Sequence, residues 1–432
     1  MPGSSAAVEA VWRIESGRLV AALTRITHDF AAAEDLAQDA LERALRQWPV
    51  DGVPEHPASW LMATAKHLAV DAYRRRLTLT RKLAGLAQET NDADERDPMA
   101  AVDEQLDTVV PDDLLRLVFL TCHPALTTES QVALTLRTVG GLTTREIARA
   151  LLVPEPTVGQ RISRAKRTLA DGRVRFELPP PEELPARLGA VLAVVYLIFN
   201  EGYAATSGDD WTRPELCRDA LRLGRLLAGL RPDEPEVHGL VALMELQASR
   251  IPARTGPWGE PVLLADQDRR RWDPLLVRRG LAALETAEAL GTGPYTLQAA
   301  IAACHARATS VESTDWRRIA ALYTVLQHLA PSPVVALNRA VAVGMAEGPE
   351  RGLTLTLRLE DEPALAGNPE LAAVRATFLQ QLGHRDEARA QFRLAAERTT
   401  NDTQRRLYLQ QAETATPRAF CRDVTAWDMT AG

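Results

Sequence analysis

The sequence predicts an all-α protein. Apolar residues recur along most of the chain at spacings of three and four, which is the period of an amphipathic helix. Alanine, leucine, arginine and glutamate, which favour helices, dominate these stretches, and alternating runs of β-branched residues are scarce. We therefore expect helices packed on helices.

The chain is too long for one ordinary domain, and two stretches interrupt its helical pattern. At about 150 residues per domain, its 432 residues suggest roughly three compact units. Residues 89–113 hold ten acidic residues and one arginine, which predicts a mobile acidic linker. Residues 178–185 hold four prolines, which predict a stiff extended spacer. The expected organisation is a domain at 1–88, the linker 89–113, a second domain at 114–178, the spacer 179–187 and a third region at 188–432.

Composition excludes several classes of protein. With 46% hydrophobic and 25% charged residues the chain is neither disordered nor collagenous. The net charge of −7 gives no overall sign of a nucleic-acid partner. The four cysteines are scattered, so neither a disulfide framework nor a metal site is expected. The longest apolar run, residues 190–199, is shorter than the ~20 residues of a membrane helix, so a cytoplasmic protein without a membrane partner is expected.

The strongest local signals lie in 114–178. Thr143 and Glu146 have the spacing of a capping box, which predicts a helix start, and a pair of glycines just before them predicts the end of another helix. After Pro154 and Pro156 a new helix is expected, with Val158, Ile162, Ala165 and Leu169 on one face. Two helices joined by a tight turn predict a helix-turn-helix, whose second helix lies in the major groove of DNA.

The other face of that second helix is polar and basic. Arginine and glutamine can make bidentate contacts with guanine and adenine, and further bases suit phosphates. Residues 156–175 carry six bases and one acid, a local charge of +5. A solvated basic face on an ordinary helix is the alternative. The candidate DNA-binding residues are Thr157, Gln160, Arg161, Ser163, Arg164 and Arg167.

Two amphipathic helices are expected in 1–88. The first has an apolar stripe opposite an acidic side that includes Glu34, Asp35 and Asp39. The second begins near Trp60 and gathers bases toward its end, so that residues 66–82 carry six bases and one acid. Separately, each of these helices is an ordinary amphipathic helix.

In combination, these strings resemble a known family. The string Ala-Glu-Asp-Leu-Ala-Gln-Asp from Ala33, followed by Ser-Trp-Leu from Ser59 and the arginine cluster, resembles region 2 of a bacterial extracytoplasmic-function (ECF) sigma factor. The string Gly-Leu-Thr-Thr-Arg-Glu-Ile-Ala from Gly141, continuing to Ala165, resembles region 4. The resemblance covers about residues 5–178, with both motifs in order around an acidic linker.

The resemblance implies two partners, core RNA polymerase and promoter DNA. The acidic face would dock on the clamp helices of the polymerase's largest subunit, region 4 would meet the flap, and the linker would run through the product channel. The residues 51–58, with Ser59 and Trp60, would capture an unpaired base of the −10 element, because aromatic stacking is worth ~1–3 kcal/mol per base. The basic helix of region 4 would recognise the −35 element. The implied polymerase-binding residues are Glu34, Asp35, Leu36, Gln38 and Asp39, and the further −10 residues are Lys66, Arg74, Arg75 and Arg76.

Residues 188–432 are an addition to a minimal member of this family. Gly383, Ala388, Phe392 and Ala395 occupy the offsets of a tetratricopeptide repeat, although a generic helical hairpin is the alternative. The chain resembles the subgroup with a long tetratricopeptide-like extension, whose repeats would bind a protein or ligand and carry no catalysis. A candidate site in the extension, or alternatively a structural ion-pair network, consists of Asn200, Glu201, Asp266, Asp268, Arg269 and Asp273.

The sequence therefore predicts a sigma factor whose fused C-terminal domain regulates or supports it, with no enzymatic activity and no cofactor. A helix-turn-helix regulator with a helical-repeat binding domain is the alternative, and the segment around Trp60 argues against it. A third hypothesis places an enzyme in the extension. That region contains no nucleophile elbow, phosphate loop or HExxH motif to support it.

Overall fold

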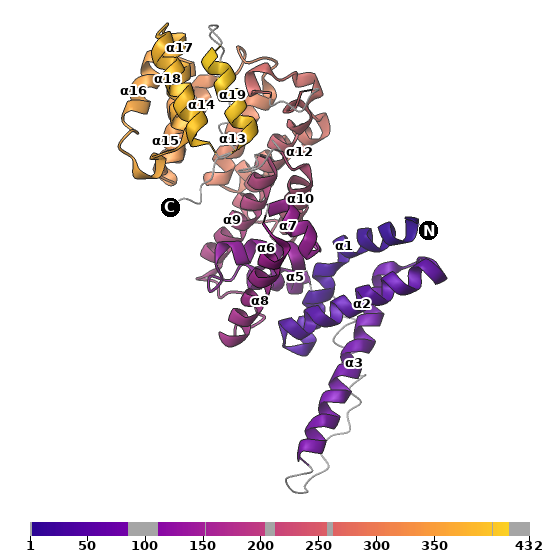
Figure 1. Cartoon of the computed structure of the whole chain (residues 1–432). Coiled ribbons are helices and arrows are strands. Elements are labelled where there is room, and N and C mark those ends of the chain that lie inside the picture. Colours follow the sequence, from indigo (N-terminus) through magenta and orange to yellow (C-terminus); the bar gives the residue numbers. More distant parts are fainter. Residues whose placement is uncertain are drawn as a thin grey trace. The chain divides into compact units, whose positions relative to one another are not determined.

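The computed structural model describes residues 2–84, 111–151, 153–203, 212–256, 262–399 and 401–413. Within these ranges the chain forms helices and turns without β-strands, which confirms the predicted all-α class (Figure 1). The chain divides into two compact units, Met1–Val194 and Val195–Gly432. Residues 89–110 of the predicted acidic linker lie outside the described residues.

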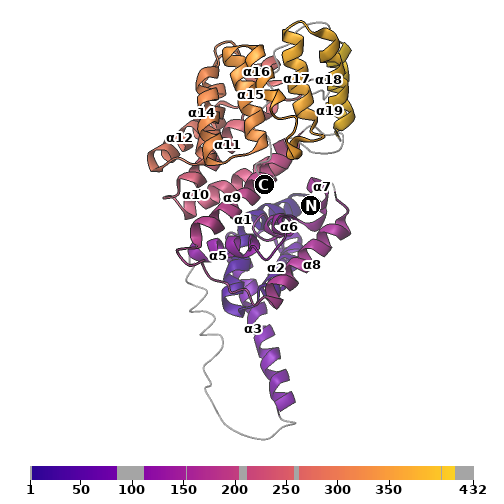
Figure 2. The same cartoon turned by 90° about the vertical axis from the view of Figure 1, so that its left-hand side faces the viewer.

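The first unit contains both of the predicted N-terminal domains. The long helix α1 packs against α2, α3 and α5 through buried residues such as Leu19 and Leu23. In both views the C-terminal half of α3 extends away from α1 and α2 (Figures 1 and 2). The helices are α1 (Pro2–Thr27), α2 (Phe30–Asp51), α3 (Pro57–Ala84), α5 (Pro111–Thr121), α6 (Thr128–Thr138), α7 (Thr144–Leu151) and α8 (Glu155–Asp171), followed by the start of α9 (Leu184–Tyr203).

Two element boundaries differ from the expected organisation. Helix α5 begins at Pro111, so the last three residues of the predicted linker belong to it. A proline and two acidic residues suit a first helical turn, because proline needs no N–H partner there and carboxylates favour the positive end of the helix dipole. The proline-rich segment ends in a turn, where the N–H groups of Glu183 and Leu184 donate to the carbonyl oxygen of Pro180. Helix α9 therefore begins within the predicted spacer.

Helix α9 is longer than its apolar run in the sequence. By length and composition it could cross a membrane, with a mean hydropathy of 1.4 over 18 residues, and it is the one such helix among the described residues. However, Tyr196, Phe199 and Tyr203 are fully buried, and a core helix passes the same test.

The second unit is a series of helices, most of which start with proline in the first turn, where its fixed φ suits a helix. Helix α11 is buried on nearly all sides and packs against α10, α12 and α13. The helices are the end of α9, α10 (Pro214–Leu230), α11 (Pro235–Ala248), α12 (Pro274–Leu290), α13 (Pro294–Arg307), α14 (Trp316–Leu329), α15 (Pro333–Glu347), α16 (Pro349–Leu357), α17 (Pro369–Gln381), α18 (Arg385–Arg398) and α19 (Asp402–Glu413). Four short 3-10 helices accompany them: η1 (Ile251–Ala253), η2 (Leu264–Asp266), η3 (Arg269–Arg271) and η4 (Pro363–Leu365).

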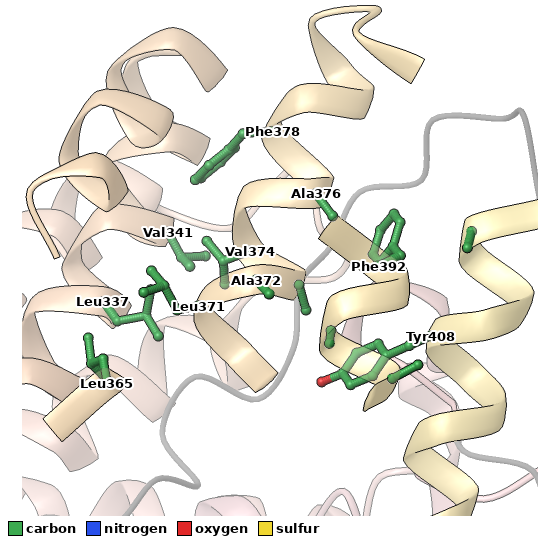
Figure 3. Close-up of a cluster of buried hydrophobic side chains, with 14 of the residues drawn as sticks. Leu337, Val341, Leu365, Leu371, Ala372, Val374, Ala376, Phe378, Phe392 and Tyr408 are labelled. Atoms are coloured by element: carbon green, nitrogen blue, oxygen red, sulfur yellow. The ribbon is translucent and has the colours of Figure 1, made fainter. Parts of the chain in front are cut away.

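The C-terminal helices form two successive helical hairpins with matching turns. The turns α15–α16 and α17–α18 contain Gly348 and Gly383, whose φ values are 114° and 86°. These glycines are about one 34-residue tetratricopeptide repeat apart. The predicted packing residues Ala388, Phe392 and Ala395 are buried. Phe392 and Ala395 belong to a core that also contains Val341 and Leu371 (Figure 3). The arrangement agrees with the predicted repeat pattern.

Candidate functional site

Helix α8 has the two faces that the sequence predicts. The capping box forms, because the N–H of Thr143 donates to Glu146 Oε2 at 2.7 Å and the N–H of Glu146 donates to Thr143 Oγ1 at 3.1 Å. These bonds start α7, after a turn in which Gly141 has a φ of 70°. The predicted apolar residues Val158, Ile162, Ala165 and Leu169 are all buried.

The polar face of α8 is presented to solvent within the first unit. Gln160, Ser163, Arg164 and Arg167 are exposed. Thr157 and Arg161 are half-buried at the edges of this face. Such a row of adaptable donors on a rigid helix suits recognition of base edges and phosphates in a groove.

The acidic face of α2 is only partly exposed. Asp29 caps the helix, since its Oδ1 accepts from the N–H groups of Ala31 and Ala32. Asp35 and Asp39 are exposed and Gln38 is half-buried. Leu36 is 8% exposed and packs in the core of the unit, so it presents little surface for a partner.

Glu34 is also buried, which the amphipathic pattern did not predict. Its side chain is 4% exposed, because side chains of α6 and α8 lie against it. Lys166 Nζ of α8 lies 2.7 Å from Glu34 Oε2, and Arg137 Nε of α6 lies 3.4 Å from Glu34 Oε1. Glu34 is one of the predicted polymerase-binding residues. Its carboxylate is therefore already paired with two basic side chains of the same chain.

The candidate −10 residues lie at the α2–α3 connection and along α3. Gly52, with a φ of 89°, ends α2. Trp60 is half-buried and packs edge-on against the buried Trp48, with ring centroids 5.5 Å apart. Ser59 is exposed beside it. The ring of Trp60 is thus held by one aromatic neighbour while part of it stays accessible.

The bases of α3 follow the connection toward the C-terminal end of the helix. Lys66 is half-buried and Arg74 is exposed. Arg75 and Arg76 belong to α3, but their side chains lie outside the described part of the chain.

The candidate site in the extension is occupied by structural interactions. Asp268 accepts from the N–H of Arg270 and pairs with its guanidinium group, and Asp273 caps α12 by accepting from the N–H groups of Leu275 and Leu276. Asp266 is exposed. These contacts favour the alternative interpretation, in which the acidic residues stabilise the chain locally.

The remaining candidates in the extension also have internal partners. Glu201 pairs with the buried Arg213, and Asn200 is 9% exposed. Arg269 lies 4.9 Å from the ring centroid of Trp272 and donates to the carbonyl oxygen of Ala308 at 2.7 Å. The described residues contain no group of histidine, cysteine and carboxylate side chains able to hold a metal ion.

One buried base in the extension gave no signal in the sequence. Arg254 is 3% exposed, and its guanidinium group lies 3.8 Å from the ring centroid of Tyr203. Burial lowers the pKa of Arg254 to about 9. This cation–π contact joins α9 to the segment after η1 and has the geometry of a structural contact.

Comparisons with known proteins match both of the predicted regions. The family model "Sigma-70 region 2" matches residues 13–77, and "Sigma-70, region 4" matches residues 116–169. The probable ECF RNA polymerase sigma factor SigI of Mycobacterium tuberculosis is 28% identical over 175 residues, which are 40% of this chain and 58% of that protein. The chain belongs to the ECF sigma factors. In this sigma factor, the match to region 2 falls within α1 to α3 and the match to region 4 falls within α5 to α8.

This ECF sigma factor carries a C-terminal extension that other proteins share. A family of unknown function, DUF6596, matches residues 187–288, from α9 to α12. An uncharacterized protein of Rhizobium meliloti (strain 1021) is 44% identical over 383 residues, which are 88% of this chain and 89% of that protein. No solved structure matches the chain. The comparisons thus extend over both units and assign no role to the extension.

Proposed function

We propose that this sigma factor binds core RNA polymerase through the exposed acidic side of α2, opens the −10 element at Trp60 and recognises the −35 element with α8. The observation that carries the proposal is the division of α8 into a buried apolar face and an exposed face with Gln160, Arg164 and Arg167. Exposed donors on the second helix after a tight turn match a recognition helix, whose side chains contact base edges in the major groove.

Each surface has a separate physical task in this proposal. Asp35 and Asp39 would meet basic residues on the polymerase, where complementary charge speeds encounter and fixes the register of docking. Trp60 would stack on an unpaired base, with its ring held by Trp48. Lys66 and the arginines of α3 would neutralise the backbone phosphates of the opened strand.

Transcription from a cognate promoter with purified core polymerase tests these assignments. Arg164→Ala should weaken binding to the −35 duplex by about 5-fold to 150-fold, since a specific base contact is worth about 1–3 kcal/mol. Trp60→Ala should leave that duplex binding intact and reduce strand opening. Arg278→Ala, which removes an exposed base of α12, is the matched control and should change neither step.

The outcome also separates this proposal from a helix-turn-helix regulator. A regulator would bind its operator without polymerase, and Trp60→Ala would then have no effect on its activity. Failure of the unaltered chain to bind core polymerase would refute the sigma-factor mechanism proposed here.

For the extension, we propose that residues 188–432 regulate or support initiation by binding a protein or ligand on the helical repeats. The paired hairpins with their matching glycine turns support a binding role, because stacked helical repeats present an extended surface. Comparing transcription by the full chain with that by a chain ending at Pro180 tests it. Increased transcription would indicate inhibition by the extension, decreased transcription would indicate a requirement, and equal transcription would refute the proposal.

A further inference from the structure

Two arginines of the second unit lie against the same buried indole ring. The guanidinium carbon of Arg250, which follows α11, lies 5.6 Å from the ring centroid of Trp272, and that of Arg269 in η3 lies 4.9 Å from it. Arg250 is 1% exposed and Trp272 is 7% exposed, whereas Arg269 is half-buried. Two positive charges are thus held beside a hydrophobic core, where their repulsion is screened much less than in water.

Hydrogen bonds to the backbone hold these groups in place. The N–H of Asp273 donates to the carbonyl oxygen of Ser249 at 2.8 Å, which ties the segment after η3 to the end of α11. Arg269 Nη1 donates to the carbonyl oxygens of His305 and Ala308 at the end of α13. Groups that are already fixed lose little freedom when a ligand binds, so the arrangement suits recognition.

Three buried polar side chains near the arginines have unused hydrogen-bonding capacity. Within the described part of the chain, Trp272 Nε1 and His305 Nδ1 are buried and have no hydrogen-bond partner. The same holds for Oε1 and Nε2 of Gln247, which precedes Arg250 by three residues and so lies on the same side of the helix end. A buried polar group without a partner costs about 1–3 kcal/mol, so native proteins keep few of them. Several in one place indicate a binding site.

The chemistry of these groups favours an anion as the occupant. Burial and the positive charges of Arg250 and Arg269 lower the pKa of His305 to about 3, so its imidazole is neutral near pH 7. A neutral imidazole can carry its proton on Nδ1 and donate it there, and the indole Nε1 only donates. Guanidinium groups are donors with a positive charge, and their planar fork matches the oxygen atoms of a carboxylate or phosphate.

We propose that the second unit binds the carboxylate or phosphate group of a small molecule at an arginine cluster that consists of Arg250, Arg269, Trp272, His305 and Gln247. The oxyanion would accept from the guanidinium groups and the indole N–H, and its charge would offset the repulsion between the arginines. Since Arg250 and Trp272 are buried, a small molecule can reach them and the surface of a macromolecule cannot. An effect of this ligand on transcription rests on the role proposed for the extension, whereas the binding itself does not.

Two tryptophans in the same hydrophobic core provide a matched pair of variants. Trp272→Phe removes the indole N–H that has no partner and keeps an aromatic ring. Trp316→Phe is the control, because Trp316 Nε1 already donates to the carbonyl oxygen of Val311 at 3.3 Å. The ring of Trp316 packs edge-on against that of His305, with centroids 5.2 Å apart, so an effect of packing alone would appear in both variants.

A second pair of variants tests the charge. Arg250→Gln removes a positive charge from the arginine cluster and should abolish binding of the anion. Arg278→Gln removes the same charge from an exposed position on α12 and should leave binding unchanged.

Hydrogen exchange in the full chain, followed on peptides of α11 and α13, measures the binding. The probes are inorganic phosphate and acetate, each compared with sodium chloride at the same ionic strength. A ligand that binds only the folded unit slows exchange through unfolding by 1 + [L]/Kd, which is about tenfold at about nine times Kd. The unaltered chain, Trp316→Phe and Arg278→Gln should show this saturable protection with at least one probe. Trp272→Phe should need about tenfold more of it, because a hydrogen bond to a charged group is lost.

The results separate the binding site from the role of the extension. Protection by phosphate or by acetate identifies the group that the site prefers. Protection by neither probe, or an equal loss in both tryptophan variants, would overturn the proposal, and protection that Arg250→Gln retains would indicate an adventitious ion only. If the probe binds as expected and the chain ending at Pro180 transcribes like the full chain, the role proposed for the extension is wrong and the anion site remains.

Discussion

The ring of Phe378 lies in a notch between two glycines, and this predicts a strong coupling between the three positions. Phe378, on α17, is 3% exposed. A Cβ on Gly344 of α15 would lie 2.4 Å from Cε1 and Cζ of the ring, and a Cβ on Gly352 of α16 would lie 2.4 Å from Cζ. The buried ring is therefore confined by two helices at once.

The expected free energies follow from this geometry. Gly344→Ala should destabilise the second unit by about 1–3 kcal/mol through overpacking, although alanine alone would gain about 1 kcal/mol in helix propensity. Phe378→Ala should cost about 3–5 kcal/mol, because a buried aromatic side chain leaves a cavity. In the Phe378→Ala background most of the cost of Gly344→Ala should disappear. The remaining cost is a contact at 3.2 Å with the Cα of Gly352.

Hydrogen exchange in increasing urea, followed on peptides of α15 to α17, measures these free energies separately from the first unit. Gly229→Ala of α10 is the control, since a Cβ there meets no atom within 4 Å, and it should be neutral or stabilising. A coupling energy of at least about 1 kcal/mol is expected between Gly344→Ala and Phe378→Ala. Additivity within about 0.5 kcal/mol would refute the argument, because it would mean that the two sites do not share this space.

Three further predictions concern single side chains. Thr143→Ala removes the capping bond to α7 and should lower the free energy of unfolding of the first unit by about 1 kcal/mol in urea titrations. Gly159→Ala in α8, where a Cβ meets no atom within 4 Å, should raise the same free energy by about 1 kcal/mol, and a decrease would contradict the open space seen there. Burial and the charges of Arg250 and Arg269 lower the pKa of His305 to about 3, so below pH 6.5 the unfolded chain binds the proton that the folded chain excludes. Stability should fall by about 2 kcal/mol between pH 6.5 and pH 5 on this account, and His305→Gln should remove that part of the decrease.

The sequence was most informative where a pattern is local. The apolar face of α8 and the capping box of α7 follow from spacings of three and four residues, and the structure confirms both. The same holds for the buried Ala388 and Phe392 and for the glycine turn before them. These features are fixed by the helix period and by backbone geometry, which a short segment contains in full.

Two acidic residues of the extension stand directly before helix starts, which is a local signal for helix capping. Asp273 stands directly before Pro274, and aspartate before a proline is the pattern of a helix cap followed by the first helical residue. Asp268 caps η3 in the same way. Charge alone suggested a ligand site, whereas the position of each aspartate next to a helix start indicates its structural use.

The burial of Glu34 could not be predicted from the sequence. On its own helix it belongs to the acidic side of an amphipathic pattern, and its partners Arg137 and Lys166 follow more than a hundred residues later. Lys166 belongs to the basic stretch 156–175, whose bases are expected to contact DNA, and Arg137 lies on α6 outside that stretch. Residues so distant in sequence meet only because α1 packs against α5. The helical periodicity of the sequence does not predict such a pair.

The bases of region 4 therefore lie on different sides of their helices, and only one side is available to the proposed DNA partner. Lys166 lies at the edge of α8 that contacts α2, whereas Gln160, Arg164 and Arg167 stay exposed while Glu34 is covered. The intramolecular pair thus takes a carboxylate from the proposed polymerase surface and leaves the proposed −35 surface exposed.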